Sequence, residues 1–455
     1  MRKKLAEALV LASVITVISG CSDTTADITD NYSESNEESS IEENSVEENV
    51  TESSDEGTSN NIDEVFSDED GTIDNQSEVS EEGDTTMNAN TDLSKVTADV
   101  AFNLLHNVDL EEQNVLISPS SIMLALGMTM NGAKGQTLDE MQNFFCKDMS
   151  LDDYNQAMYE EITRLKSSES CTWNVADSIW INGDMELSED FAGTVSDKYY
   201  GDIFSSLFDN STVSEMNQWV NNNTSGMIKK IVESLPADSQ MILLNALSFE
   251  GKWEESYSDI DIYEDDEFTA FDGTVQSVTM IHDSVNSYVE CGNSIGFTLD
   301  YEGGDYAFMA LLPFDGITPS ELINELSGDD FINAFNSRTD EKVNIRFPEF
   351  TNEYDTDISE ALKNLGIETA FTTDADFSGF FGSNEGLFID SVLHKTHIEV
   401  DREGTRAAAV TGAVVLGTAL DMEEKCVILN RPFVYAIVDN TSGMPIFIGV
   451  VNSVD

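Results

Sequence analysis

One serine of this chain lies in a pattern that could support hydrolysis. Residues 292–296 read GNSIG, the motif in which a nucleophilic serine, here Ser294, occupies a sharp turn between a strand and a helix. His394 or His397 could act downstream as the general base. The residues that follow, FTLDYEGGDYAFMALLPF, predict a strand, a turn and a second strand. Because the helix that would raise the serine above a sheet is missing, the sequence argues against an enzyme.

The histidines and cysteines do not form a metal-binding pattern. His394 and His397 have an odd spacing, which places them on opposite faces of a strand. His394 has apolar neighbours and could instead be a buried hydrogen-bond donor that joins two elements. The cysteines beyond Cys21 lack a C-x-x-C pair and are Cys146, Cys171, Cys291 and Cys426. We therefore expect no metal and no cofactor, while disulfides and scattered buried thiols both remain open.

The segment 403–420, EGTRAAAVTGAVVLGTAL, carries no charge after Arg406. It is shorter than a membrane-spanning helix of about 20 residues. As a core helix it would be weakened by Gly412 and Gly417, each of which costs about 1 kcal/mol relative to alanine. With a period of two, one face would consist of Thr405, Ala407, Ala409, Thr411, Ala413 and Val415. This face is small and uncharged, so the segment could enter between two existing strands with little steric or desolvation cost.

The overall composition limits the possible partners, and its change along the chain separates an acidic N-terminal part from the rest. The 455 residues include 88 acidic and 21 basic side chains, which disfavours nucleic acid as a partner. Residues 22–94 contain no Lys or Arg and are rich in Asp, Glu, Ser, Thr and Asn. Such a composition cannot bury enough apolar surface to fold, so we expect a disordered, extended acidic tether.

The first 21 residues predict an export signal. Residues 2–4 are basic, residues 8–18 are apolar, and ISGC at 18–21 resembles the bacterial lipobox. The resemblance implies that Cys21 is lipidated after cleavage, which gives a membrane-anchored lipoprotein facing outward, or an extracellular protein if it is released. The alternative is an ordinary secretory signal with an incidental cysteine. Any contact with a membrane would be through the N-terminal lipid only.

Residues 95–455 have the sequence pattern of one folded domain. Ser118 precedes Pro119, which predicts an N-cap and a helix through Met130. Apolar runs at 240–249 and 306–314 predict buried strands, and 431–451 predicts two strands around a hairpin loop. Helices gather in the first half and strands in the second, without regular alternation. The predicted fold class is therefore α+β.

Several segments of this domain form an ordered series. In chain order they are NVLISPSSIMLALGMTMNGAKGQT at 114–137, NQWVNNNTSGMIKKIV at 217–232, LLNALSFEGKW at 243–253, VNIRFPEF at 343–350, LHKTHIEVDREGTRAAAV at 393–410 and NRPFVYAIVDNTSGMPIFIGVV at 430–451. The series resembles the motifs of the serpins, in their order and at roughly their spacing, and covers nearly all of the domain. The resemblance implies the serpin fold, in which helices pack on three β-sheets and a reactive-centre loop is exposed near the C-terminus.

The resemblance also implies a function. Inhibitory serpins are suicide inhibitors of serine endopeptidases: the protease cleaves the loop, forms an acyl intermediate and is trapped when the loop inserts into the main sheet. The hinge of that loop would be Gly404, Thr405, Ala407, Ala408 and Ala409. A serine protease is therefore the expected partner, and we expect a monomer. The alternative is a non-inhibitory protein with the serpin fold that is a protease substrate or a binding protein.

Further residues are assigned through the same resemblance. Ser118, Ser121, Asn245 and His394 look like the family's shutter, which controls separation of the main-sheet strands. Trp253 looks like the aromatic residue at the breach, where insertion begins. Simple helix capping by Ser118 and plain core packing by Trp253 remain alternatives to these roles.

The cleaved bond is assigned less directly. Aligned with the family on Gly404, the cut falls between Thr418 and Ala419, and the alternatives are cleavage after Val415, Leu416 or Leu420. Two features depart from the family: the longer spacing from the hinge to Pro432, and Arg402 where inhibitory members usually carry Glu. All candidate residues are small or aliphatic. A shallow apolar specificity pocket suits them, so we expect elastase-like or subtilisin-like targets.

Overall fold

The computed structural model describes residues 85–147, 149–183, 185–236, 238–383, 386–405 and 425–454, with side chains described from residue 93. In these ranges, no helix is both long and apolar enough to cross a membrane. The N-terminal signal with Cys21, nearly all of the predicted tether and most of the segment 403–420 lie outside the described residues.

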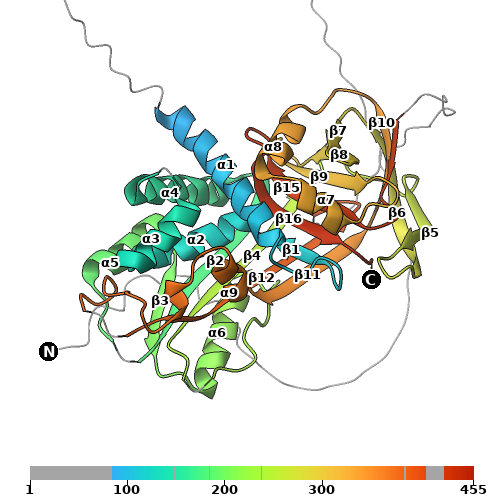
Figure 1. The fold of residues 1–455 in the computed structure, drawn as a ribbon. Helices are drawn as coiled ribbons and strands as arrows, with labels where there is room; N and C mark the ends of the chain where they lie inside the picture. The colour runs from blue at the N-terminus through green and yellow to red at the C-terminus, as the bar shows by residue number, and fades with distance from the viewer. Residues whose placement is uncertain are drawn as a thin grey trace, which may run out of the picture. The chain divides into compact units, whose positions relative to one another are not determined.

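Helices predominate in the first half of the described chain (Figure 1). They are α1 (Thr85–Leu105), α2 (Pro119–Met130), α3 (Gly135–Phe145), α4 (Leu151–Ser167), α5 (Glu189–Thr194), α6 (Asn210–Asn223), α7 (Pro319–Glu325), α8 (Gly328–Asn336) and α9 (Ser359–Asn364), with short π- and 3₁₀-helical turns η1 (Val195–Tyr199) and η2 (Thr369–Phe371). The helix predicted after Ser118 is confirmed: the Ser118 side chain accepts from the backbone N–H of Ser121, and Pro119 begins the helix. Helix α1 starts before Lys95, the predicted start of the domain, and Leu93 and Ser94 are already buried.

The strands form three sheets, as the resemblance implied. One sheet has the order β1 (Val115–Ile117), β16 (Pro445–Val451), β15 (Phe433–Asp439), β9 (Tyr306–Pro313), β8 (Ser294–Asp300) and β7 (Tyr288–Cys291). The smaller sheet has the order β14 (Lys425–Ile428), β10 (Val343–Pro348), β6 (Val275–Val285) and β5 (Ile262–Thr269). The third, here called the main sheet, has the order β11 (Phe350–Asp357), β12 (Ile389–Asp401), β13 (Gly404–Thr405), β4 (Met241–Lys252), β2 (Cys171–Asn182) and β3 (Asp202–Ser206).

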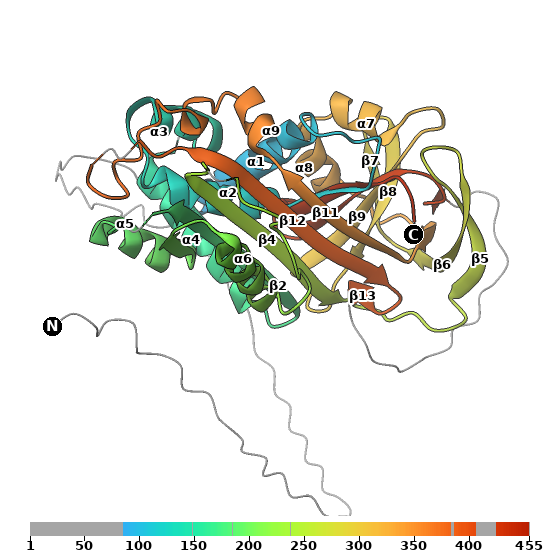
Figure 2. The same ribbon diagram turned by 90° about the horizontal axis from the view of Figure 1, so that it is seen from below.

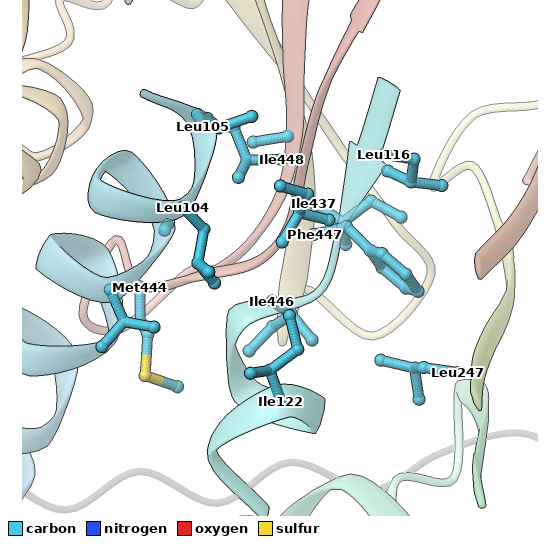
Figure 3. Packing of buried hydrophobic residues seen from close by; sticks show 14 of the residues in the cluster. Leu104, Leu105, Leu116, Ile122, Leu247, Ile437, Met444, Ile446, Phe447 and Ile448 are labelled. Atoms are coloured by element: carbon cyan, nitrogen blue, oxygen red, sulfur yellow. The ribbon is translucent and has the colours of Figure 1, made fainter. Parts of the chain in front are cut away.

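The two faces of the main sheet pack against different parts of the protein. On β4, Met241, Leu243, Leu247 and Phe249 belong to the large core, and we call the face of the sheet that they form the inward face. Strand β1 and helix α2 enclose the same core, where Leu116, Ile122 and Leu247 lie near β15 and β16 (Figure 3). The alternate residues of β4, such as Ile242 and Leu244, instead pack against Met216 and Val220 of α6. This alternation follows from the period of two along a strand, and it makes the main sheet buried on both faces over most of β4.

Ser294 does not have the geometry of a nucleophile. It begins strand β8, is fully buried, and donates its hydroxyl to the carbonyl oxygen of Cys291 at 2.6 Å. The chain continues as β8 and β9, the predicted strand, turn and strand, and a nucleophile elbow requires a helix there. His394 and His397 lie on β12 in another sheet, so the structure does not bring a base to this serine through strand pairing.

Candidate functional site

The central feature of the main sheet is a parallel pair of strands that separates at one end. Strands β4 and β12 lie side by side (Figure 2), paired from Met241 opposite Ile389 to Ser248 opposite His397. Beyond this point the short strand β13 lies between them and pairs antiparallel with both. Thr405 is opposite Gly251 on β4 and Val400 on β12. The start of the predicted hinge therefore already occupies the opening between the two strands.

Small residues allow the hinge to enter this opening. Gly404 has φ +154°, and a Cβ atom there would lie 2.1 Å from the carbonyl oxygen of Gly251. Only glycine permits this approach of two backbones. The next side chain, Thr405, is buried, and its hydroxyl shares a hydrogen bond of 2.7 Å with the Tyr301 hydroxyl. Thr405 thus lies on the inward face, the side that the period-two pattern requires to be small and uncharged.

Trp253 lies at the same end of the sheet, immediately after β4. Its indole Nε1–H donates to the carbonyl oxygen of Asp401 at 2.8 Å, and its backbone N–H donates to the carbonyl oxygen of Glu403 at 3.1 Å. The indole also stacks on Tyr301, with ring centroids 4.8 Å apart. Trp253 is therefore both packed in the core and bonded to the turn that leads into the hinge, and its role in insertion stays a prediction.

The turn between β12 and β13 is held by charged groups. The Asp401 carboxylate accepts from the backbone N–H groups of Glu403 at 2.7 Å and Gly404 at 3.2 Å. Arg402 donates from Nε to Oε1 of Glu349 at 3.1 Å and lies 3.6 Å from Asp259. This pair raises the pKa of Arg402, first through the hydrogen bond to Glu349. Although Arg402 departs from the family pattern, the structure provides it with two acidic partners: Glu349, between β10 and β11, and Asp259, in the loop before β5.

The four residues assigned to the shutter meet beneath the middle of the main sheet. His394 Nδ1 lies 2.5 Å from Oδ1 of Asn245, the residue opposite it on β4. The Asn245 amide nitrogen donates to Ser121 Oγ of α2 at 2.5 Å. His394 Nε2 accepts from the backbone N–H of Ser118 at 3.2 Å, so Nδ1 must carry the proton and donate to Asn245. The contacts link β4 and β12 to the start of α2, and their role in strand separation stays a prediction.

A fifth member of this group, Asp177 of β2, was not found by sequence reasoning. It lies opposite Asn245, and its Oδ1 accepts from the second amide hydrogen of Asn245 at 2.5 Å. We call Ser118, Ser121, Asp177, Asn245 and His394 the Asn245 cluster. The available signal was a single carboxylate in the run NVADSIWIN, residues 174–182. Such a charge requires an explanation only once its apolar neighbours are known to be buried.

 

Burial determines the charge states within the Asn245 cluster. Asp177 lies in NVADSIWIN, residues 174–182, and is 4% exposed. Burial raises the pKa of its carboxyl to about 7, although the hydrogen bond from Asn245 acts in the opposite direction. Burial also lowers the pKa of His394 to about 3, so this histidine is neutral at ordinary pH. The cluster therefore contains one carboxyl group that titrates near neutrality.

Other predicted site residues lie outside the described residues. They are Cys21, the hinge residues Ala407, Ala408 and Ala409, and the candidate cleavage residues Val415, Leu416, Thr418, Ala419 and Leu420. Their roles stay predictions.

The cysteines of the described chain are free thiols. Cys146, Cys171 and Cys291 are buried, and Cys426 is exposed. Burial raises the pKa of the Cys146 and Cys291 thiols to about 12, which keeps them protonated and unreactive. Of the two possibilities left open by the sequence, the structure shows thiols rather than disulfides.

Comparison with known proteins places this architecture in a family. Residues 95–454 match the family described as Serpin (serine protease inhibitor). An uncharacterized serpin-like protein of Thermococcus kodakarensis is 30% identical over 76% of this chain and 82% of its own length, and intracellular coagulation inhibitor 2 of Tachypleus tridentatus is 29% identical over 75% and 86%. The native crystal structure of tengpin, a thermophilic serpin, matches with a TM-score of 0.76 and 40% identity, covering 80% of this chain and 94% of tengpin. The chain belongs to the serpin family, most of whose members inhibit proteases.

Proposed function

We propose that this protein is a suicide inhibitor of serine endopeptidases. A protease would cleave the segment between β13 and β14, and the freed hinge would enter the main sheet between β4 and β12 before the acyl intermediate is hydrolysed. The observation that carries the proposal is the position of Gly404 and Thr405, which already pair with both strands at the end where these separate.

The register of β13 supports insertion of a longer strand. Each further residue of the hinge would pair with the next residue back along β4 and along β12, because antiparallel strands run in opposite directions. Ala407 would lie opposite Phe249 and Ile398, two residues of the inward core. Thr411 would reach Asn245 and His394, which would separate the two residues that hold the strands together. The small face predicted from the sequence would therefore be the inward one throughout.

The same register places the one charge of the inserting segment favourably. Arg406 would lie between Glu250 of β4 and Glu399 of β12, on the outward face. Both positions are next to the pairs that Thr405 makes, and Glu399 is exposed. An arginine between two carboxylates at a partly exposed site is favourable rather than a barrier to insertion. This complementarity supports an inhibitor over a non-inhibitory protein with the same fold.

The number of residues that fit between β4 and β12 helps to choose among the candidate cleavage sites. Val415 would lie opposite Met241, the first residue of β4, and Leu416 opposite Ile389, the first residue of β12. Cleavage after Val415 would leave the acyl group inside the sheet, where a protease cannot fit. Cleavage between Thr418 and Ala419 would leave two residues outside to connect the inserted strand to the protease. The register thus favours Thr418 and Ala419 over Val415 as the site of cleavage.

The residues next to the candidate bonds suggest the class of target. Thr418, Leu416 and Leu420 are small or aliphatic, and none of the candidates is basic. Such side chains fit a shallow apolar specificity pocket and cannot pair with the acidic pocket of trypsin-like enzymes. We therefore propose elastase-like or subtilisin-like proteases as the targets.

The first test is to mix the full chain separately with pancreatic elastase, subtilisin and trypsin, and to analyse the three mixtures on a denaturing gel. We expect elastase to form a complex that survives denaturation. The mass of the released C-terminal peptide should show that this peptide begins at Ala419. Cleavage by elastase and by subtilisin without any complex would contradict the inhibitor proposal and support a non-inhibitory substrate. A stable complex with trypsin but not with elastase would contradict the proposed target class alone.

A further inference from the structure

A row of polar side chains crosses three strands of the main sheet. Asp177 of β2 lies opposite Asn245 of β4, and Asn245 lies opposite His394 of β12. All three are buried and face inward, toward α2. Asn245 is the central member, because its amide nitrogen bonds to Asp177 and its amide oxygen bonds to His394. Separating β4 from β12 must break this row between Asn245 and His394.

The carboxyl at one end of the row is incompletely paired. Asp177 Oδ1 accepts from Asn245, but the buried Oδ2 atom has no hydrogen-bond partner among the residues that the structure describes. No described Lys or Arg forms an ion pair with it at 4 Å or less. A buried carboxylate that has one hydrogen bond and no paired cation is strongly disfavoured, whereas a protonated carboxyl avoids the cost of burying a charge.

We propose that Asp177 is a positioning residue for strand insertion: its proton keeps the Asn245 cluster closed, and loss of that proton favours separation of β4 from β12. Opening the sheet at Asn245 and His394 would admit water to the inward face beside Asp177, where it could hydrate the carboxylate. The charged form therefore gains more from opening than the neutral form does. This inference rests on the proposed insertion mechanism, but it can be measured without a protease.

The groups around Asp177 leave it as the titrating member of its cluster. From β12, His394 faces the row and is neutral, with its pKa lowered to about 3 by burial. Helix α2 contributes the uncharged Ser118 and Ser121. From α4, the exposed Lys166 exerts a weaker influence on Asp177 than burial and the bond from Asn245 do.

Two other carboxyls, one at each end of β12, have an environment that differs from that of Asp177. Burial raises the pKa of both Asp390 and Asp401, yet each accepts hydrogen bonds from two backbone N–H groups, of residues 240 and 241 and of residues 403 and 404 respectively. Backbone donors favour the ionised form. Neither carboxyl belongs to the Asn245 cluster.

The direction of the pH effect follows from the raised pKa. The folded, closed protein binds the Asp177 proton up to about pH 7, whereas an unperturbed aspartate has a pKa of 3.8. The stability of the closed sheet is therefore highest at low pH and falls as the pH rises toward 7, where the proton is lost. A difference of one unit in the pKa of Asp177 between the closed and open sheets would change the opening equilibrium about tenfold.

The test uses a synthetic peptide that imitates the inserting strand. The full chain is incubated at pH 6, 7 and 8 with the acetylated and amidated peptide TRAAAVTGAVVL, residues 405–416, and the rate of complex formation is followed by native mass spectrometry. The peptide has no group that titrates in this range. We expect the rate for the natural protein to rise about five- to tenfold from pH 6 to pH 8, because a pKa difference of one unit gives about fivefold over this interval and a larger difference approaches tenfold. In Asp177→Asn the rate should stay nearly constant over this range.

Control variants separate this inference from simpler explanations. Glu267→Gln removes an exposed charge on β5, in a different sheet, and should keep the rise. Asp177→Ser, a second neutral variant, replaces Asp177→Asn if the latter does not fold. An equal rise in the neutral variants, or a constant rate in the natural protein, would overturn the role of Asp177 while the proposed function stands. If the peptide enters the sheet at no pH, this inference and the insertion mechanism both fail.

Discussion

At the scale of single residues, the end of the main sheet depends on a few side chains that hold the hinge in place. Trp253 bonds to the turn through Nε1 and its backbone N–H, and Tyr301 bonds to Thr405. Burial of the Tyr301 hydroxyl raises its pKa well above the ordinary value, so it remains a neutral partner for Thr405. Arg402 and Glu349 add an ion pair at the surface of the same region.

The Arg402–Glu349 pair can be tested by reversing its charges. Arg402→Glu would place three acidic groups together, with Glu349 and Asp259, and should lower the free energy of unfolding by about 1 kcal/mol because the pair is partly exposed. The double variant Arg402→Glu, Glu349→Arg should recover most of this loss. Urea unfolding of the single and double variants measures the coupling. If the changes in unfolding free energy caused by Arg402→Glu and by Glu349→Arg simply add in the double variant, the ion pair does not stabilise the breach.

At the scale of elements, the opening between β4 and β12 distinguishes the two faces of an inserting strand. Its inward face would meet Leu247 and Phe249 of the large core. On the outward face, Ile242, Leu244 and Ala246 belong to the second apolar cluster, and Glu250, nearer the breach, is half-buried. A charge is therefore tolerated differently on adjacent residues of the hinge. The parallel pairing of β4 and β12 also makes this the place where an antiparallel strand can pair on both sides.

Two neighbouring alanines provide a matched test of this difference. Ala409→Glu would place a carboxylate opposite Leu247 on the inward face, so insertion should slow and elastase should cleave the protein without forming a complex. Ala408→Glu would place the same charge on the outward face, between the polar Ser248 and the half-exposed His397, and should retain more of the inhibition. The measurement is the fraction of protein in the covalent complex on a denaturing gel. Equal loss in both variants would contradict the proposed register.

At the scale of the whole molecule, the proposed mechanism requires the main sheet to accept another strand between β4 and β12. Cleavage within residues 406–424 would permit a strand from Gly404 to about Leu416 to add hydrogen bonds on both of its sides. Each such bond contributes about 1 kcal/mol net, against the entropy of ordering the strand. The cleaved protein should therefore be more stable than the intact one.

Calorimetry of the intact and cleaved proteins tests this expectation. Limited proteolysis within 406–424 should raise the melting temperature by about 10 °C or more, because a large domain shifts by roughly 2 °C for each kcal/mol. The Ala409→Glu variant, cleaved in the same way, is the control and should gain less. An unchanged melting temperature after complete cleavage would indicate that the segment stays outside the sheet.

Much of the local structure could be predicted from the sequence. Strands at 240–249 and 306–314, the helix after Ser118 and the hairpin near 439–443 are all present, because each depends on short-range patterns of apolar residues, caps and turns. Through the family resemblance the sequence also indicated four members of the Asn245 cluster. Asp177, Tyr301 and Glu349 were missed, since nothing in their local sequence shows which distant residue they contact.

The sequence by itself determined the small, uncharged face that begins at Thr405, because the period of a strand depends only on neighbouring residues. It also determined that the helix α2 begins at Pro119, directly after the N-cap Ser118. Only the tertiary structure decided that Thr405 lies between β4 and β12 and that Asp177, Asn245 and His394 form one row. These three residues are far apart along the chain, and strand register and burial in the assembled sheet set both their contacts and the raised pKa of Asp177.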